Sequence, residues 1–173
     1  MPAAGKTTLA RGLAAELRLP LVGKDDLKEL LYDELGTGGA DWSRRLGAAA
    51  YALIFAFCRE VLASGHGVIA EANFFSGSQE AQFEALPRHR LVQIHCTAPL
   101  ELLVARYTAR TRHPGHVDDE RARELRQRFD EGTHRPLELN GELIEVETSR
   151  PVDLRALAKR VQAAFSVSST SRP

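Results

Sequence analysis

Apolar residues recur at helical spacing along most of the chain. Between Lys6 and Leu17 they lie three and four positions apart, which predicts an amphipathic helix. The same spacing predicts further helices over residues 25–35, 41–63, 78–86, 99–112, 118–131 and 152–165. In the longest of these helices, the spacing predicts a buried inner face made of Leu46, Ala50, Leu53, Ile54, Phe57 and Val61.

Short apolar runs separate these helices and predict β-strands. The runs cover residues 21–22, 68–72, 91–96 and 143–146. Strands that are apolar throughout and alternate with helices are typical of βαβ units, whose parallel sheet is covered on both faces. The expected fold class is therefore α/β, with a parallel sheet and helices on both of its faces.

Length and composition agree with a single domain. The chain has 173 residues, of which 43% are hydrophobic and 27% charged, so one ordinary core is expected. We assign the domain to residues 1–165. Residues 166–173 are rich in Ser and Thr and show no period, which predicts a disordered tail.

The charge balance and the cysteines limit the class of partner. Lys and Arg number 23, and so do Asp and Glu, so no global field attracts nucleic acid or an anionic membrane. Cys58 and Cys96 lie in separate apolar runs and are expected to be buried thiols. With no signal-peptide layout and no run of eighteen apolar residues, we expect a cytoplasmic protein without a membrane partner.

The first eight residues, MPAAGKTT, form the second half of the phosphate-binding motif GxxxxGK[ST]. In this motif Lys6 reaches the β- and γ-phosphates of a nucleotide, and the hydroxyl of Thr7 binds Mg²⁺. The backbone N–H groups of the loop and of the following helix hold the phosphates. These groups would come from Ala3, Ala4, Gly5 and Thr8. The alternative is an ordinary helix start with an exposed lysine.

The first glycine of that motif would come before Met1, as would the strand that leads into the loop. In this class of fold that strand is central, and its loss would leave a gap in the sheet. We therefore expect the coding sequence to extend upstream by roughly ten residues rich in Val, Ile and Leu.

Two acidic residues lie near the carboxyl ends of predicted strands, where ligands bind in doubly wound sheets. Asp25 stands where a base is needed near an acceptor hydroxyl. The alternative role of Asp25 is a helix N-cap. Asp26 can take this role instead, because Asp26 and Glu29 have capping-box spacing. Glu71 ends an apolar run and is the candidate for Mg²⁺, or else a simple strand-end carboxylate.

An arginine cluster near the middle of the chain suits a lid that closes over a nucleotide. Arg106 and Arg110 share a helix face, and Arg112 lies beside the turn over residues 113–116. The alternative is a set of solvated arginines paired with the acidic residues that follow. His113 and His116 have no further ligand at a familiar spacing, so they do not predict a metal site.

Trp42 follows the glycine-containing loop over residues 36–39. It either lines an acceptor site together with Arg44 and Arg45 or anchors the long helix, and the second role is favoured.

In order and spacing, four segments resemble the P-loop kinases of the AAA-domain ATP-binding protein family. This family is related to the 5′-hydroxyl kinase domain of polynucleotide kinase and to chloramphenicol phosphotransferase. The segments are PAAGKTT (2–8), KDDLK (24–28), VIAEAN (68–73) and ARYTAR (105–110), so the resemblance spans nearly the whole chain.

The resemblance implies a P-loop NTPase fold with strand order 2-3-1-4-5, of which this chain lacks the first strand. It implies that Asp25 is the catalytic base, that Arg106 and Arg110 are lid arginines, and that the loop near residues 148–151 borders the adenine. Glu71 stands where relatives often have aspartate. Because no arginine finger of the ring-forming machines is visible, a monomer or homodimer is expected.

The sequence thus predicts an ATP- and Mg²⁺-dependent kinase that phosphorylates a hydroxyl group. Lys6, Thr7 and the loop amides would bind the phosphates, Asp25 would take the acceptor proton, and Arg106 and Arg110 would stabilise the transferring group. A small-molecule acceptor is favoured over a nucleic-acid 5′-hydroxyl because no basic, aromatic-studded groove is evident. The rival functions are a nucleotide switch without an acceptor and an interaction module that binds no nucleotide.

Overall fold

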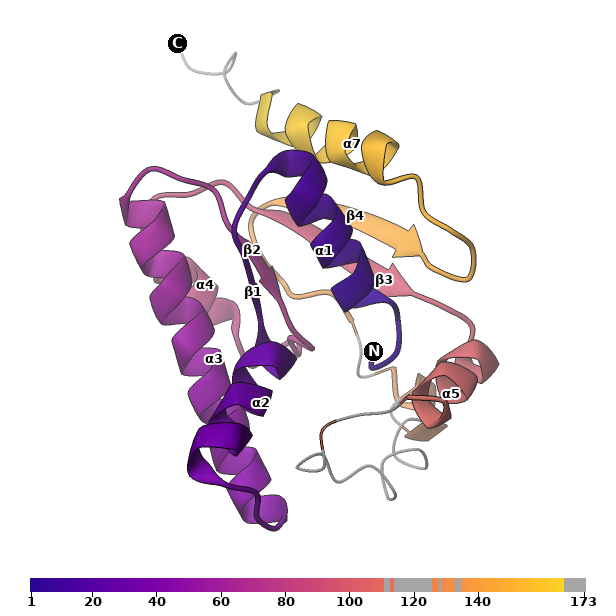
Figure 1. Cartoon of the computed structure of the whole chain (residues 1–173). Helices are drawn as coiled ribbons and strands as arrows, with labels where there is room; N and C mark the ends of the chain where they lie inside the picture. The colour runs from indigo at the N-terminus through magenta and orange to yellow at the C-terminus, as the bar shows by residue number, and fades with distance from the viewer. Residues whose placement is uncertain (111–112, 114–125, 128, 133–134, 167–173) are drawn as a thin grey trace.

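The computed structural model describes residues 1–110, 113, 126–127, 129–132 and 135–166. Helices and strands alternate through these residues, as predicted (Figure 1). In chain order the elements are α1 (Lys6–Leu17), β1 (Leu21–Gly23), α2 (Lys24–Leu35), α3 (Ala40–Ala63), β2 (Ile69–Glu71), α4 (Glu80–Glu84), β3 (Val92–Thr97), α5 (Leu100–Thr108), β4 (Glu142–Glu147) and α7 (Leu154–Ser166).

The strands form two parallel pairs. β1 pairs with β2, with Val22 opposite Ala70, and β3 pairs with β4, with Ile94 opposite Ile144. Among the described residues the two inner strands, β2 and β3, form no ladder with each other. If the first strand of the expected order 2-3-1-4-5 is left out, the observed pairs correspond to strands 2-3 and 4-5.

Two hydrophobic clusters cover the opposite faces of the sheet. Ile69 and Ala70 are neighbours on β2, and they pack into different clusters because successive strand residues point to opposite faces. The first cluster joins α1, α5 and α7 to β3 and β4, and its most buried strand residue is Ile144, with 0% exposure. The second joins α3 to β1 through Ile54 and Val22. This layering confirms the expected α/β class.

Helix α3 is less buried than its sequence predicts. Leu46, Ala50 and Ile54 are buried as expected, but Leu53 and Phe57 remain 44% and 40% exposed. The predicted inner face was therefore too wide, because α3 packs on one side against α2 and β1 while its opposite side faces outward. By length and composition alone this helix could cross a membrane. In the structure 28% of its most hydrophobic window is buried.

Several predicted boundaries differ from the observed ones by a few residues. The helix predicted over 78–86 is the five-residue α4, and the one predicted over 99–112 ends at Thr108. Ser166, assigned to the tail, is the last residue of α7. The rest of the tail and most of the predicted 118–131 helix lie outside the described residues.

Candidate functional site

The loop over residues 2–5 has the backbone conformation of a tight turn that leads into α1. Ala3 and Gly5 both have positive φ angles, 59° and 75°, and Ala3 and Ala4 are buried. No side chain caps the N-terminus of α1, so its first N–H groups stay available to an anion. The loop therefore forms the tight turn that its sequence predicts, directly before the N-terminus of a helix.

Lys6 and Thr7 begin α1 and face the carboxyl end of β2. The Thr7 hydroxyl donates a hydrogen bond to Glu71 Oε2 at 3.2 Å, while Lys6 Nζ donates to the Met1 carbonyl at 2.7 Å. Burial lowers the pKa of Lys6, and the nearby carboxylates of Glu71 and Asp25 oppose this shift. Burial likewise raises the pKa of Glu71, against the attraction of Lys6. The structure thus brings the four residues predicted for phosphate, Mg²⁺ and base chemistry to one place.

Asp25 lies in the first turn of α2, directly after β1, with Lys24 Nζ 3.9 Å from its Oδ1. The predicted capping by Asp26 is wrong. The N-cap of α2 is Gly23 and has no side-chain cap bond, and Asp26 instead binds Arg11 at 3.0 Å. Asp25 is nevertheless free of the N-cap role, since it lies inside the helix.

Arg106 lies beside the loop and is held by the residue that follows β4. Its guanidinium donates to the Thr148 hydroxyl at 3.2 Å and to the Thr148 carbonyl at 2.6 Å. The Thr148 hydroxyl is also 3.1 Å from the carbonyls of Ala4 and Thr97. Buried Thr148 therefore links α5, β3 and the phosphate-binding loop.

The remaining lid residues are only partly described. Arg110 follows α5, is exposed, and lies close enough to Lys6 to lower its pKa. His113 stacks on Tyr32 with ring centroids 5.4 Å apart, and its Nε2 lies 3.1 Å from Asp33 Oδ1. The segment after α5 therefore reaches α2. Arg112 and His116 lie outside the described residues, so the predicted lid as a whole stays a prediction.

Tyr51 of α3 is a site residue that sequence reasoning missed. Its hydroxyl donates to the Asn73 carbonyl at 2.5 Å, and Lys24 Nζ lies 5.2 Å from its ring centroid. Burial raises its pKa, with further increases from the negative charges of Asp25 and Glu71. No local motif marks Tyr51, because its partners come from α2 and from the segment after β2.

Trp42 anchors the start of α3. Its Nε1 donates to the Gly36 carbonyl at 2.8 Å, and the Arg45 guanidinium lies 5.4 Å from its ring centroid. A Cβ on Gly38 would approach the Trp42 side chain to 2.8 Å. The indole thus holds the preceding loop in a position that needs glycine, as the favoured prediction has it.

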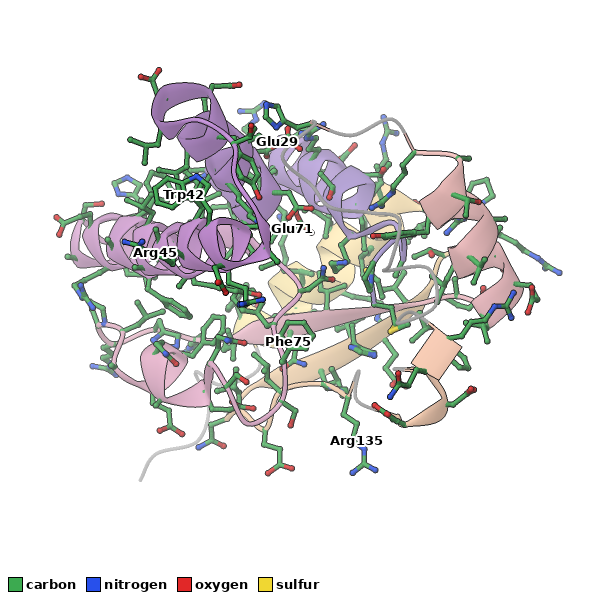
Figure 2. All side chains as sticks on the ribbon, turned by 90° about the horizontal axis from the view of Figure 1, so that it is seen from below. Glu29, Trp42, Arg45, Glu71, Phe75 and Arg135 are labelled. Carbon is green, nitrogen blue, oxygen red and sulfur yellow. The ribbon has the colours of Figure 1, made fainter. Side chains whose placement is uncertain are left out.

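The hydroxyl of Thr7 and the carboxylate of Glu71 fit Mg²⁺. Both are oxygen ligands, which this hard cation prefers, and it commonly keeps several waters beside one or two protein ligands. Figure 2 shows Glu71 near the centre of the molecule, whereas Arg135 points outward at its edge. Among the described residues, no three His, Cys, Asp or Glu side chains gather to form a protein-only metal cluster.

A small pocket with a cavity volume of about 90 Å³ adjoins Lys6 between the inner strands. Residues 72–75 after β2 and residues 93–96 of β3 line it, together with Arg135 at the other side. Asn73 Oδ1 is buried there without a hydrogen-bond partner.

The family assignment follows from a comparison of the whole sequence. A family model described as AAA domain, AAA_33, matches residues 1–132, a range that includes the loop, Asp25, Glu71, Arg106 and Arg110. The chain belongs to this family. With the parallel strands and flanking helices, membership establishes an α/β P-loop NTPase fold and implies nucleotide binding. None of the curated proteins compared with the chain matches it.

Three solved structures resemble this AAA_33 protein. A protein from Chloroflexus aurantiacus J-10-fl, described as a candidate kinase, is 37% identical, with a TM-score of 0.88 over 94% of this chain and 93% of that one. A sugar kinase from Janibacter sp. HTCC2649 is 18% identical, with a TM-score of 0.62 over 96% and 90%. Shikimate kinase from Bacteroides thetaiotaomicron is 18% identical, with a TM-score of 0.56 over 95% and 93%. The latter two show the fold alone.

Proposed function

We propose that this protein is an ATP- and Mg²⁺-dependent cytoplasmic kinase that phosphorylates a hydroxyl group of a small molecule. The observation that carries the proposal is the convergence of Lys6, Thr7, Asp25 and Glu71 at the carboxyl ends of β1 and β2. A cation, a carboxylate base and two oxygen ligands for Mg²⁺ are the parts that phosphoryl transfer requires. The match to a 37% identical candidate kinase supports the same class of reaction.

In this proposal the loop amides and Lys6 bind the phosphates of ATP, and Thr7 and Glu71 hold Mg²⁺. When bound, Mg²⁺ neutralises charge on the phosphate oxygens. Asp25 accepts the proton of the acceptor hydroxyl as its oxygen attacks the γ-phosphorus. The bond between this phosphorus and the β–γ bridging oxygen breaks, and ADP leaves. Arg106 and Arg110 stabilise the negative charge of the transferring group.

The acceptor class is the finer part of the proposal. The balanced charge of the chain favours a small molecule over a nucleic-acid 5′-hydroxyl, despite the resemblance to the polynucleotide kinase domain. The folds shared with a sugar kinase and a shikimate kinase make sugars, polyols and hydroxylated carboxylates the first acceptors to test.

The first experiment measures ADP release with Mg-ATP across that acceptor panel, with a 5′-hydroxyl oligonucleotide and an acceptor-free reaction alongside. We expect a small hydroxyl compound to stimulate release. We expect Asp25→Asn to lower the stimulated turnover by about 10²- to 10⁴-fold, the range contributed by general bases. Binding of Mg-ATP, measured by calorimetry, should change little, because Asp25 contacts the acceptor.

Asp26→Asn is the matched control. This substitution removes the same charge one residue away, from a carboxylate that binds Arg11. We expect it to keep turnover within a few-fold. Full turnover in Asp25→Asn would disprove the base assignment. Release stimulated by no hydroxyl would favour a nucleotide switch, and the absence of Mg-ATP binding in the parent chain would refute the proposed function.

A further inference from the structure

The buried hydroxyl of Thr148 lies where three segments that are far apart in the sequence meet. Thr148 directly follows β4 and is 8% exposed. Its hydroxyl oxygen lies 3.1 Å from the carbonyl oxygens of Ala4 and Thr97, and it accepts a hydrogen bond from Arg106 Nη1 at 3.2 Å. The Arg106 guanidinium also donates to the Thr148 carbonyl at 2.6 Å. One small side chain therefore contacts both the phosphate-binding loop and Arg106.

The single proton of this hydroxyl is available to the Ala4 carbonyl. A guanidinium has only donors, so the hydroxyl oxygen must act as the acceptor toward Arg106. The Thr97 carbonyl already accepts a hydrogen bond from the Thr148 backbone N–H at 2.9 Å. Ala4 is 0% exposed, so bulk water does not reach its carbonyl. The hydroxyl can thus donate to the loop while it accepts from Arg106, which an aliphatic side chain of the same shape cannot do.

The Thr148 side chain also packs against the turn of the loop. A Cβ on Gly5 would lie 3.5 Å from the Thr148 Cβ, which is ordinary van der Waals range. The turn contains two positive φ angles, 59° at Ala3 and 75° at Gly5. A residue with a side chain, such as Ala3, keeps a positive φ only when its surroundings hold it there. The contacts of Thr148 are therefore part of what holds the loop in its conformation.

We propose that Thr148 is a positioning residue whose hydroxyl fixes the Arg106 guanidinium relative to the phosphate-binding loop. The inference rests on the proposed function, in which Arg106 and the loop N–H groups act on the same nucleotide. A guanidinium that is held in place before the nucleotide arrives loses little further freedom on binding, and preorganised charges stabilise developing charge best. Thr148 need not contact the nucleotide, because it acts through Arg106.

A purely structural role for Thr148 makes a different prediction. Loss of the hydroxyl would then lower the stability of the fold, and it would change nucleotide affinity either not at all or by the same factor with and without Arg106. A positioning role instead makes the two substitutions non-additive, because removing either residue breaks the same arrangement. A double-mutant cycle separates the two roles.

The test is calorimetric titration of the full chain with Mg²⁺ and a non-hydrolysable ATP analogue. Thr148→Val removes the hydroxyl, keeps the shape of the side chain and should weaken binding about tenfold. Arg106→Ala alone should weaken binding at least as much. In the Arg106→Ala background, Thr148→Val should weaken binding by no more than about a further threefold. Thr148→Ser keeps the hydroxyl and should bind within about threefold of the parent chain.

Thr108→Val is the matched control, because it removes a hydroxyl that donates to the Val104 and Ala105 carbonyls of its own helix at an exposed site. It should leave the affinity unchanged, and thermal unfolding should show that every variant is folded at the titration temperature. Equal losses from Thr148→Val with and without Arg106 would overturn the proposal. So would undiminished affinity in Thr148→Val or Arg106→Ala, or a Thr148→Ser variant as weak as Thr148→Val.

The same titrations distinguish failure of this inference from failure of the proposed function. Non-additive losses in a chain whose ADP release no hydroxyl compound stimulates would support the positioning role and refute the kinase. Additive losses in a chain that does phosphorylate an acceptor would refute the positioning role alone. A parent chain that binds no nucleotide would overturn both.

Discussion

Burial of the Lys6 ammonium group lowers the stability of the folded chain. Burial lowers the pKa of its ammonium group, which means that the folded chain disfavours the charged form. For a base whose folded pKa lies below its unfolded value, stability increases as pH rises between the two values. In the proposed function this buried ammonium group would bind the phosphates of the nucleotide.

We therefore expect Lys6→Met to stabilise the chain at pH 7 in the absence of nucleotide. Replacing a buried ammonium by an apolar chain of similar length should raise the free energy of unfolding by about 1 kcal/mol, or Tm by about 2–4 °C. The advantage should shrink toward pH 10, as wild-type Lys6 loses its proton. Differential scanning calorimetry at several pH values measures both effects.

With saturating Mg-ATP the order should reverse, because only the wild type gains stability from the ligand, by about 2.7 kcal/mol at 100 times its dissociation constant. A Lys6→Met variant with an undiminished Mg-ATP shift would contradict the role given to Lys6. A variant less stable than wild type at pH 7 would contradict the burial argument.

Helices α2 and α3 are joined by a buried polar contact that positions the helix carrying Asp25. Lys28 Nζ and the Tyr32 hydroxyl both donate to Ser43 Oγ, at 2.8 and 2.7 Å. All three side chains are at most 4% exposed. Such a contact restricts how the two helices pack, because a shift between them would break hydrogen bonds that are buried.

At this scale we predict that Ser43→Ala costs about 2–4 kcal/mol of unfolding free energy, since it removes the buried oxygen that accepts hydrogen bonds from both Lys28 and Tyr32. Chemical denaturation measures the loss. Ser64→Ala at the other end of α3 is the matched control, because its hydroxyl bonds the Val61 carbonyl at an exposed site. It should cost at most about 0.5 kcal/mol. If both substitutions lower the unfolding free energy equally, the buried contact stabilises the chain no more than the exposed hydrogen bond does.

At the scale of the whole molecule, the strands that the structure describes form two pairs, and the inner edges of these pairs, on β2 and β3, share no ladder. Open strand edges expose backbone donors and acceptors and can pair with a further strand. The apolar residues beside these edges, Ile69 and Ile94, pack against the first cluster from opposite pairs. The two pairs are thus held together by helices and side chains.

We expect an added N-terminal strand to lock the two pairs together. An extension of about ten residues rich in Val, Ile and Leu and ending in Gly should raise Tm and slow amide exchange in β2 and β3. A Gly/Ser extension of equal length is the control and should do neither. If both extensions behave alike, the central strand expected from the family order does not form at this position.

The alternation of apolar runs and helical stripes predicted the α/β class, all four strands and most helices, because each of these signals depends only on local periodicity. The loop motif and the position of Asp25 after a strand were also predicted from the sequence, because each is recognised from residues that are neighbours along the chain. The capping of α2 was predicted wrongly, because Arg11, distant in sequence, takes the carboxylate of Asp26.

Only the tertiary structure decided which of several possible partners each side chain meets. Arg106 is held by Thr148, and Tyr51 reaches Asn73, across 42 and 22 positions of sequence. Leu53 and Phe57 continue the apolar stripe of α3 but remain exposed, because the sheet and α2 are narrower than that stripe. Periodicity determines which residues are able to be buried, whereas the size and position of the neighbouring elements determine which ones are.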